Sequence, residues 1–297
     1  MQSKLAERLH LRYEPAAILS SDEKPSDART YPDGQWVCAA AMLSAAMRGR
    51  TFAVGHSTGV CHGGRHGLCL NDKRTARVDG HMTCGVPGVK AMPGREPLGL
   101  KKTVEFAAAD RENTPYRNIP EEYVIFRPLS LVKENETPRM VVMYADCDQL
   151  SALTAMANFG RAGFDNVIVP SASACVTFCL LTEEENRREF PRAIISMTDL
   201  FARRFIDNDL LAFSIPWKLY QEMEENVRSM SGNFLDRPAW KHLEGRKSRF
   251  FPARENPAPS RNLLAGAEQY RFPPGKSGDD FRDTRQPELR PLPLYRG

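Results

Sequence analysis

The chain has 297 residues, of which 41% are hydrophobic and 26% charged, a composition typical of globular proteins rather than membrane-embedded or disordered ones. Its net charge of +4 is too small to indicate a nucleic-acid-binding surface, and no apolar stretch reaches the ~20 residues that a membrane-spanning helix needs. Charged side chains interrupt the leucines of the first twelve residues, so we expect no signal peptide, a cytoplasmic protein and reduced cysteines.

The N-terminal third is predicted to contain a helix, a strand, a second helix and a long loop. Spaced leucines indicate a short amphipathic helix over residues 5–11, and a strand is expected over 16–19. Residues 37–47 (VCAAAMLSAAM) have high helix propensity, which puts Cys38 in a first helical turn. Residues 55–99 are dense in glycine, histidine and cysteine without apolar periodicity, so we expect a long loop of the kind that usually serves function.

The middle of the chain alternates strand and helix signals. Residues 123–126 and 140–144 are rich in β-branched and aromatic residues, which favours strands. Asp146 is well placed to cap a following helix, and a short strand over 167–169 completes a βαβ-like unit that favours partly parallel pairing. Because ligands tend to bind beyond the carboxyl ends of such strands, the segment leading to Cys175 is a candidate site.

The C-terminal part predicts further secondary structure followed by an irregular tail. A helix is expected over 199–205, a strand over 210–213 and a helix starting at Pro216. The predicted fold is α/β or α+β, with a mixed sheet and flanking helices in a single domain over residues 1–245. Prolines punctuate residues 246–297, so we expect an extended or partly disordered charged tail.

Cysteines and glycines are the residues that point to chemistry. Cysteine thiolates suit zinc and iron–sulfur clusters, but none of the seven cysteines forms the C-x2-C pair of a zinc ribbon or ferredoxin. The stretch CHGGRHGLC, residues 61–69, is followed by His81 and Cys84, and such density suggests a metal. Gly63 and Gly64 can adopt positive φ, which would let the backbone approach a cofactor closely. The alternative is a glycine-rich surface loop with incidental thiols.

The later cysteines divide into one candidate site residue and two candidate core residues. Cys175 is expected near a helix N-terminus, where the helix dipole would lower its pKa and favour a role as ligand or nucleophile. Cys147 and Cys179 are flanked by apolar residues, and cysteine is among the most buried residue types. We therefore expect both to be buried core residues.

Several segments in a fixed order resemble one known family. They are an L-x-L-x-x-x-P-x-A run at Leu9, Leu11, Pro15 and Ala17, a cysteine opening an alanine-rich helix at Cys38, C-x-G-G at Cys61, Gly63 and Gly64, Leu98-Gly99-Leu100, Asp148-Gln149, a small-residue turn into Cys175, Asp199 with Arg203 or Arg204, Ile215-Pro216-Trp217 and Phe234. Over roughly residues 5–240 the chain resembles the domain-of-unknown-function 169 family, an uncharacterised archaeal and bacterial group also described as ArCR.

This resemblance implies a metal or iron–sulfur cofactor, because the family is widespread among anaerobes and its recurring cysteines suggest such a site. The interval between Cys61 and Leu98 is longer than the family pattern, so an insertion carrying Cys69, His81 and Cys84 is expected. Either Cys61 or Cys84 can therefore hold the family cysteine position.

The leading functional hypothesis is an iron–sulfur cluster, with zinc as the alternative, held by Cys38, Cys61 and Cys175 with Cys84 or a histidine as fourth ligand. Three thiolates would leave one iron open as a Lewis acid for a small-molecule substrate. Four would favour electron transfer or a structural role.

Two alternatives belong to other functional classes. The first is a metal-free enzyme in which Cys175 is the nucleophile and His62, His66 or His81 the base. The second is a non-enzymatic module that grips an anion, or that docks on a partner or a second copy of the chain through its proline-rich tail. No Walker or Rossmann motif occurs in strand-to-helix context, so nucleotide chemistry has little support.

Overall fold

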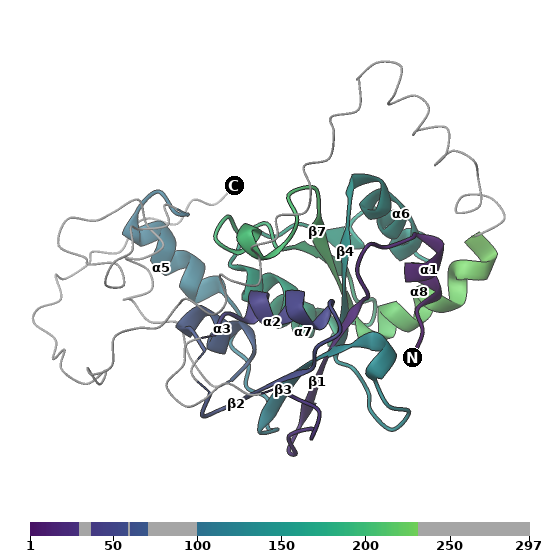
Figure 1. The fold of residues 1–297 in the computed structure, drawn as a ribbon. Coiled ribbons are helices and arrows are strands. Elements are labelled where there is room, and N and C mark those ends of the chain that lie inside the picture. The colour runs from purple at the N-terminus through teal and green to yellow at the C-terminus, as the bar shows by residue number, and fades with distance from the viewer. Residues whose placement is uncertain (30–36, 59, 71–99, 231–297) are drawn as a thin grey trace, which may run out of the picture.

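A mixed β-sheet forms the centre of the protein (Figure 1). The structure is a computed structural model that describes residues 1–29, 37–58, 60–70 and 100–230. Within these residues seven strands lie in the order β2-β3-β1-β4-β7-β6-β5. Their bounds are β1 Ala16–Ser21, β2 Phe52–Gly55, β3 Tyr123–Pro128, β4 Met140–Ala145, β5 Val167–Ile168, β6 Ala193–Ser196 and β7 Leu211–Pro216. Neighbouring strands are antiparallel except β5 and β6, so the predicted mixed sheet is confirmed.

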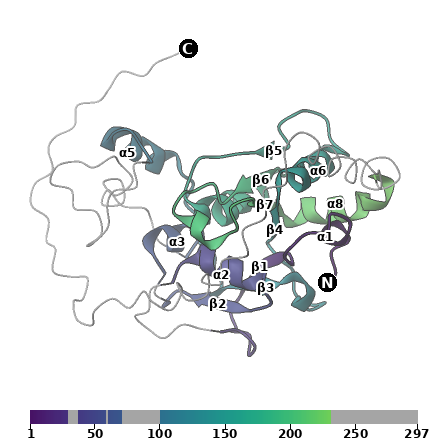
Figure 2. The same ribbon diagram turned by 45° about the horizontal axis from the view of Figure 1, so that its top comes forward.

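Helices cover both faces of this sheet, as predicted. One layer contains α2, α3, the π-helix η2 and α7, and the opposite layer contains α1, α6 and α8 (Figures 1 and 2). The helical elements are α1 Lys4–Arg8, α2 Ala39–Ala46, α3 His62–Gly67, α5 Val104–Asn113, η1 Leu129–Leu131, α6 Cys147–Asn158, η2 Val176–Leu180, α7 Leu181–Glu185, η3 Ala202–Phe205 and α8 Trp217–Met230.

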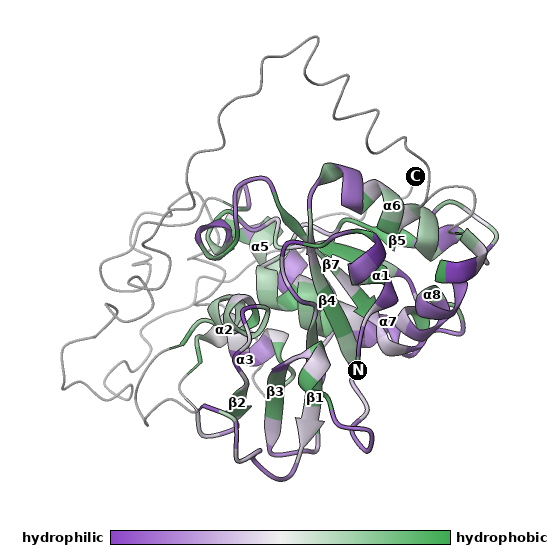
Figure 3. Ribbon diagram, turned by 45° about the vertical axis from the view of Figure 1, so that its right-hand side comes forward, coloured by the Kyte–Doolittle hydropathy of each residue, from purple (hydrophilic) through white to green (hydrophobic). Residues whose placement is uncertain are grey.

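Strand β4 shows why the central strands are apolar without alternation. Val142 and Tyr144 face the layer of α2, whereas Val141 and Met143 face the layer of α6 and α8, and all are fully buried. Figure 3 shows the hydrophobic residues gathered along β4 and β7, between the two layers. Because both faces are covered by helices, a strand here needs apolar residues at every position even in an antiparallel arrangement.

Helix α6 begins as its sequence predicts. The Asp146 side chain accepts a hydrogen bond from the Gln149 backbone N–H at 2.8 Å, and the Gln149 side chain accepts one from the Asp146 N–H at 2.9 Å. This reciprocal capping box satisfies two backbone donors that a helix N-terminus otherwise leaves without partners.

Other local expectations need correction. The stretch over 55–99, expected to be a loop throughout, contains α3, and β2, β6 and α5 have no counterpart among the predicted elements. Strands β4 and β5 do run in the same direction, but β7 and β6 lie between them in the sheet. Pairing partners are set by tertiary packing, which local sequence signals do not record. The expected tail over 246–297 lies outside the described residues.

A buried arginine links β3 to two loops. Arg127 has only 1% of its side chain exposed and donates hydrogen bonds to both carboxylate oxygens of Glu136 and to Asp27. Burial alone would raise the pKa of Glu136, but the Lys133 N–H and the Arg127 charge outweigh it and lower the pKa. Breaking a buried pair of this kind is costly because it leaves an uncompensated charge.

We predict that Arg127→Met lowers the free energy of unfolding by about 3 kcal/mol, measured by urea denaturation at neutral pH. The control is Asp27→Asn, which should cost less than about 1 kcal/mol because the Asp27 side chain is half exposed. Equal losses in the two variants would contradict this account.

Candidate functional site

Cys38 and Cys61 lie on neighbouring segments. Val37 and Val60, which directly precede them, form a parallel β-bridge. Each cysteine is the N-cap of the helix that follows, Cys38 of α2 and Cys61 of α3. The predicted position of Cys38 at a helix start is therefore confirmed to within one residue, and two cysteines 23 positions apart are brought together at two helix N-termini.

Glycines shape the first turn of α3, although not as predicted. The Cys61 Sγ accepts a hydrogen bond from the Gly64 N–H at 3.2 Å. A Cβ at Gly64 would lie 2.4 Å from the Val60 side chain, whereas a Cβ at Gly63 would meet nothing within 4 Å. Both glycines are helical, so the expected positive φ is wrong for both. Gly64 permits close packing around the Cys61 thiol, and cofactor contact by either glycine stays a prediction.

Cys175 reaches the same region from a distant part of the chain. A Cβ at Gly67, the last residue of α3, would lie 2.5 Å from both the carbonyl carbon and the Cβ of Cys175. Cys175 is buried and begins the helical segment that continues through η2 into α7. The Ala174 N–H donates to the Asp199 carboxylate at 3.2 Å, which fixes the start of this segment.

Burial and neighbouring charges both shift the pKa of Cys175. Burial raises this pKa well above the usual value, and negative charge on Cys61, Cys38 and Asp199 would raise it further, while the Ala40 N–H opposes the rise. The Ala40 N–H hydrogen-bonds to both Cys38 and Cys175, and Coulomb interactions fall with distance, so Cys38, Cys61 and Cys175 lie in one region of the fold. This region contains three of the four predicted metal ligands.

Cys38 is partly buried beside a positive side chain. Burial raises its pKa, the first backbone N–H groups of α2 and the Arg204 charge lower it, and the Asp199 charge raises it. The guanidinium of Arg204 lies 4.1 Å from the ring centroid of Phe201 and 4.9 Å from that of Phe205. Stacking on two rings holds this cation near the Cys38 thiol.

The structure describes only some of the other candidate ligands and bases. Cys84 and His81 lie outside the described residues. His66 is buried and stacks on the ring of Tyr116, with 6.5 Å between ring centroids. Across residues 1–29, 37–58, 60–70 and 100–230, no three or more histidine, cysteine, aspartate or glutamate side chains surround a point as ligands of a single metal ion would.

Of the two cysteines that were expected to be buried in the core, only one is buried. Cys179 is fully buried, as expected, but Cys147 is exposed. Cys147 is the first residue of α6, and the buried face of that helix is formed by Leu150, Leu153 and Met156. Apolar neighbours in sequence did not reveal which side of the helix Cys147 occupies.

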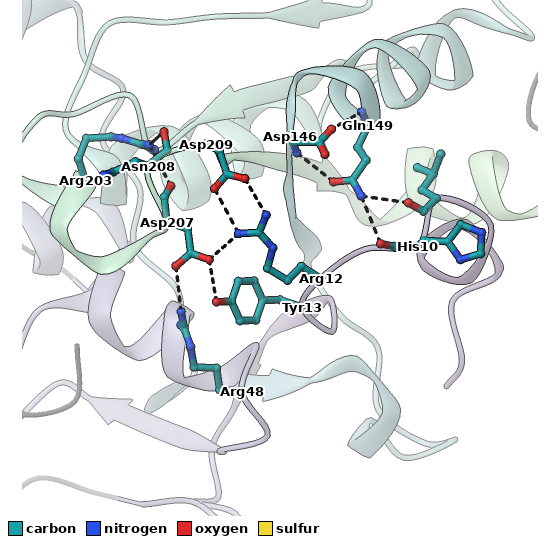
Figure 4. A network of polar contacts seen from close by, with 11 residues as sticks. His10, Arg12, Tyr13, Arg48, Asp146, Gln149, Arg203, Asp207, Asn208 and Asp209 are labelled. Atoms are coloured by element: carbon teal, nitrogen blue, oxygen red, sulfur yellow. Dashed lines mark hydrogen bonds and ion pairs between the residues drawn. The ribbon is translucent and has the colours of Figure 1, made fainter. Parts of the chain in front are cut away.

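A polar network fixes the C-terminal half of α2, at the opposite end from Cys38 (Figure 4). Arg48 lies 4.4 Å above the Tyr13 ring, and the Asp207 carboxylate accepts hydrogen bonds from Tyr13 and Arg12 at 2.9 and 2.8 Å. Ser44 donates to the Phe205 carbonyl at 2.6 Å. These contacts join α2 to the segments before β1 and β7, so the helix that begins after Cys38 has little freedom to shift.

Comparison with known proteins identifies the family. The model of the domain-of-unknown-function 169 family, described as uncharacterised ArCR, matches residues 4–226. The chain belongs to this family. No curated protein and no solved structure matches the chain significantly. No helix in the described part of this family member is long and apolar enough to cross a membrane.

The motifs that carried the resemblance to the domain-of-unknown-function 169 family can be located in the fold. Cys38, Cys61, Cys175 and Asp199 come from four separate motifs and meet in one region. The role of Asp199 at the start of the Cys175 segment was not expected from the sequence, where it stood only as part of a motif. Leu98-Gly99 and Phe234 lie outside the described residues.

We predict opposite effects for two alanine substitutions in α3. Gly67→Ala should lower the free energy of unfolding by about 1–3 kcal/mol, because its Cβ overlaps the Cys175 backbone. Gly63→Ala should be neutral or stabilising by up to about 1 kcal/mol, because its Cβ enters open space and alanine favours helix. Thermal and urea unfolding of both variants checks this pair, and a destabilised Gly63→Ala would argue against the described helix.

Proposed function

We propose that Cys38, Cys61 and Cys175 are ligands of an iron–sulfur cluster. The observation that carries this proposal is the convergence of three thiols from distant segments, each at the start of a helical element. In this environment the negative charge of one thiolate raises the pKa of the next, so three thiolates need a shared positive charge. A metal cluster supplies that charge.

The chemistry of the donor set fits such a group. Without metal, burial keeps Cys175 and Cys38 protonated, and metal binding must displace those protons. Backbone N–H groups directed at the sulfur atoms, such as that of Gly64 on Cys61, are among the contacts by which a protein sets a cluster's reduction potential. When bound, the cluster supplies either electron transfer or Lewis acidity.

We propose a cluster rather than zinc because the recurring cysteines of the family resemblance suggest an iron–sulfur site. Thiolates that bind different irons of a cluster lie farther apart than those around one ion, so the lack of a single-ion grouping among the described residues is compatible with a cluster. The position of Cys61 beside Cys38 also favours Cys61 over Cys84 as the family cysteine. Cys84 or a histidine then remains for the fourth position.

The number of protein ligands decides between two roles. Three thiolates leave one iron open to polarise an oxygen of a small substrate, and the neighbouring Arg204 can attract an anionic group to that position. A fourth protein ligand closes the cluster and favours electron transfer. The proposal also includes a cytoplasmic location, no nucleic-acid partner and self-association through the tail over 246–297.

The metal-free alternative has less support. A nucleophilic cysteine needs a lowered pKa or a nearby base, but the pKa of Cys175 is raised, chiefly by burial. Among the candidate bases, His66 is buried and stacks on Tyr116. In the described part of the chain, Arg204 and the start of α2 are the features that favour an anion-binding role without metal.

We predict that protein purified without oxygen contains iron and acid-labile sulfide, and that Cys38→Ser, Cys61→Ser and Cys175→Ser each lose most of both. The matched control is Cys147→Ser, which removes an exposed thiol outside the site and should retain the cluster. Iron and sulfide analysis with visible and electron paramagnetic resonance spectra measures this. A folded, colourless, iron-free wild-type protein would exclude the proposal.

The variant Cys84→Ser separates the two roles. We expect it to keep its iron but change the resonance spectrum if Cys84 is the fourth ligand, and to leave the spectrum unchanged if that position is open. Added small carboxylates should perturb the wild-type spectrum only in the second case, because only an open iron can accept a new ligand.

A further inference from the structure

A second pair of cysteines lies close to the proposed cluster ligands but is not part of them. Helix α3, which ends just before Cys69, packs against η2, which carries Cys179, and both cysteines are fully buried in the same core. The two thiols lie near enough for each to shift the pKa of the other. Cys69 follows the end of α3, and Cys179 lies in η2, four residues after Cys175. A disulfide requires two thiols on closely packed segments, and the described structure has both as free cysteines.

The backbone at Cys69 adopts a conformation that cysteine disfavours. Its φ is +63°, and it occupies the position after the α3 C-cap where glycine is usual. The Cys69 N–H donates to the His66 carbonyl at 3.1 Å, and the Leu70 N–H donates to the Arg65 carbonyl at 2.9 Å, which completes the helix-ending motif. A cysteine in a conformation that favours glycine makes its thiol a candidate for a functional role.

The backbone at Cys179 is also unusual. Residues Val176–Leu180 form a π-helix, a conformation found mainly as short insertions and often at functional sites. Thr182 donates its hydroxyl to the Thr177 carbonyl at 3.2 Å, which supplies a partner inside the irregular turn. The Cys179 thiol is therefore held on a well-packed segment.

A buried arginine gives the two thiols different acidities. Arg139 donates from Nε to Glu183 at 3.1 Å, while Nη1 and Nη2 are buried and meet no nitrogen or oxygen acceptor among the described residues. The Cys179 thiol and the Arg139 charge lower the pKa of Cys69, against burial and Glu183, which raise it. The Cys69 thiol, with burial, raises the pKa of Cys179. Cys69 is thus the more acidic thiol of the pair.

We propose that Cys69 and Cys179 are a redox-active dithiol that a small hydroperoxide converts to a disulfide. The Cys69 thiolate attacks one peroxide oxygen, the O–O bond breaks, and the leaving hydroxide takes a proton to form water. The Cys179 sulfur then attacks the sulfenic sulfur of Cys69, and the S–O bond breaks to release a second water with the Cys179 proton. Two thiols and one hydrogen peroxide give one disulfide and two waters.

The disulfide would join the end of α3 to η2 covalently. Cys61 caps the other end of α3, and Cys175 lies just before η2, so the link would fix two of the three thiol-bearing segments of the proposed cluster relative to each other. The dithiol itself does not require that a cluster is present, because its partners are Arg139 and Glu183 rather than a metal.

The experiment uses the full chain, reduced and then treated with one equivalent of hydrogen peroxide. Free thiols are blocked with N-ethylmaleimide in denaturant, and peptides are mapped by mass spectrometry before and after reduction. We expect a single major cross-link, Cys69 to Cys179, and a midpoint of thermal unfolding raised by roughly 5 °C or more, because the link closes a long loop.

Variants assign the roles. Cys179→Ser should stop at a sulfenic acid on Cys69 that dimedone traps, whereas Cys69→Ser should leave Cys179 unreacted. Arg139→Gln should slow the reaction at least about tenfold, and Arg139→Lys should restore part of the rate if the positive charge is what matters. Circular dichroism verifies folding, and Cys147→Ser should behave as wild type because its thiol lies elsewhere.

Cys69 and Cys179 remaining as thiols in folded wild-type protein, or a dominant cross-link to any other cysteine, would overturn the proposal. So would cross-linking that requires denaturant. Iron is measured in the same samples, so the two proposals fail separately: iron-free protein that forms the cross-link contradicts only the cluster, and iron-loaded protein that does not form it contradicts only the dithiol.

Discussion

The contact between Gly67 and the backbone of Cys175 is the constraint on which the sulfur chemistry of this protein depends. Because glycine has no Cβ, α3 can lie directly against the segment that begins at Cys175, at a separation that a side chain would not allow. Cys61 lies before this contact and Cys69 after it. One close approach therefore sets the position of both the three-thiol cluster and the Cys69–Cys179 pair.

Burial then decides what each thiol can do. In a low-dielectric interior a thiolate is unfavourable unless positive charge or hydrogen bonds compensate. The neighbours that shift the pKa of Cys175 are two thiols, a carboxylate and one N–H group, so burial and these negative charges favour its protonated form. Cys69 has Arg139 and the Cys179 thiol, so it ionises more easily. Cys175 and Cys69 lie on the same side of the sheet, but the charges nearest to each thiol suit them to different chemistry.

The sequence predicted the parts of the fold whose signals are local. The apolar run of β4 and the capping residues of α6 are readable because each depends on neighbouring residues. Helix α3 was missed because three of its six residues are glycine, and its stability comes from packing and caps rather than propensity. The exposure of Cys147 likewise depends on the face of α6 that packs, which one residue's neighbours do not reveal.

The convergence of Cys38, Cys61 and Cys175 could be expected only from the order of family motifs, since their spacing carries no metal-binding pattern. The fold also places the buried cysteines on one side of the sheet, which no sequence motif indicated. The core between the sheet and α1, α6 and α8 includes no cysteine among the described residues, while the opposite core includes Cys69, Cys175 and Cys179, with Cys38 packed against it. One layer of helices therefore serves to support the sheet, and the other carries the thiols. A change in metal or redox state would act first on α2, α3 and η2, with the sheet behind them as a rigid base.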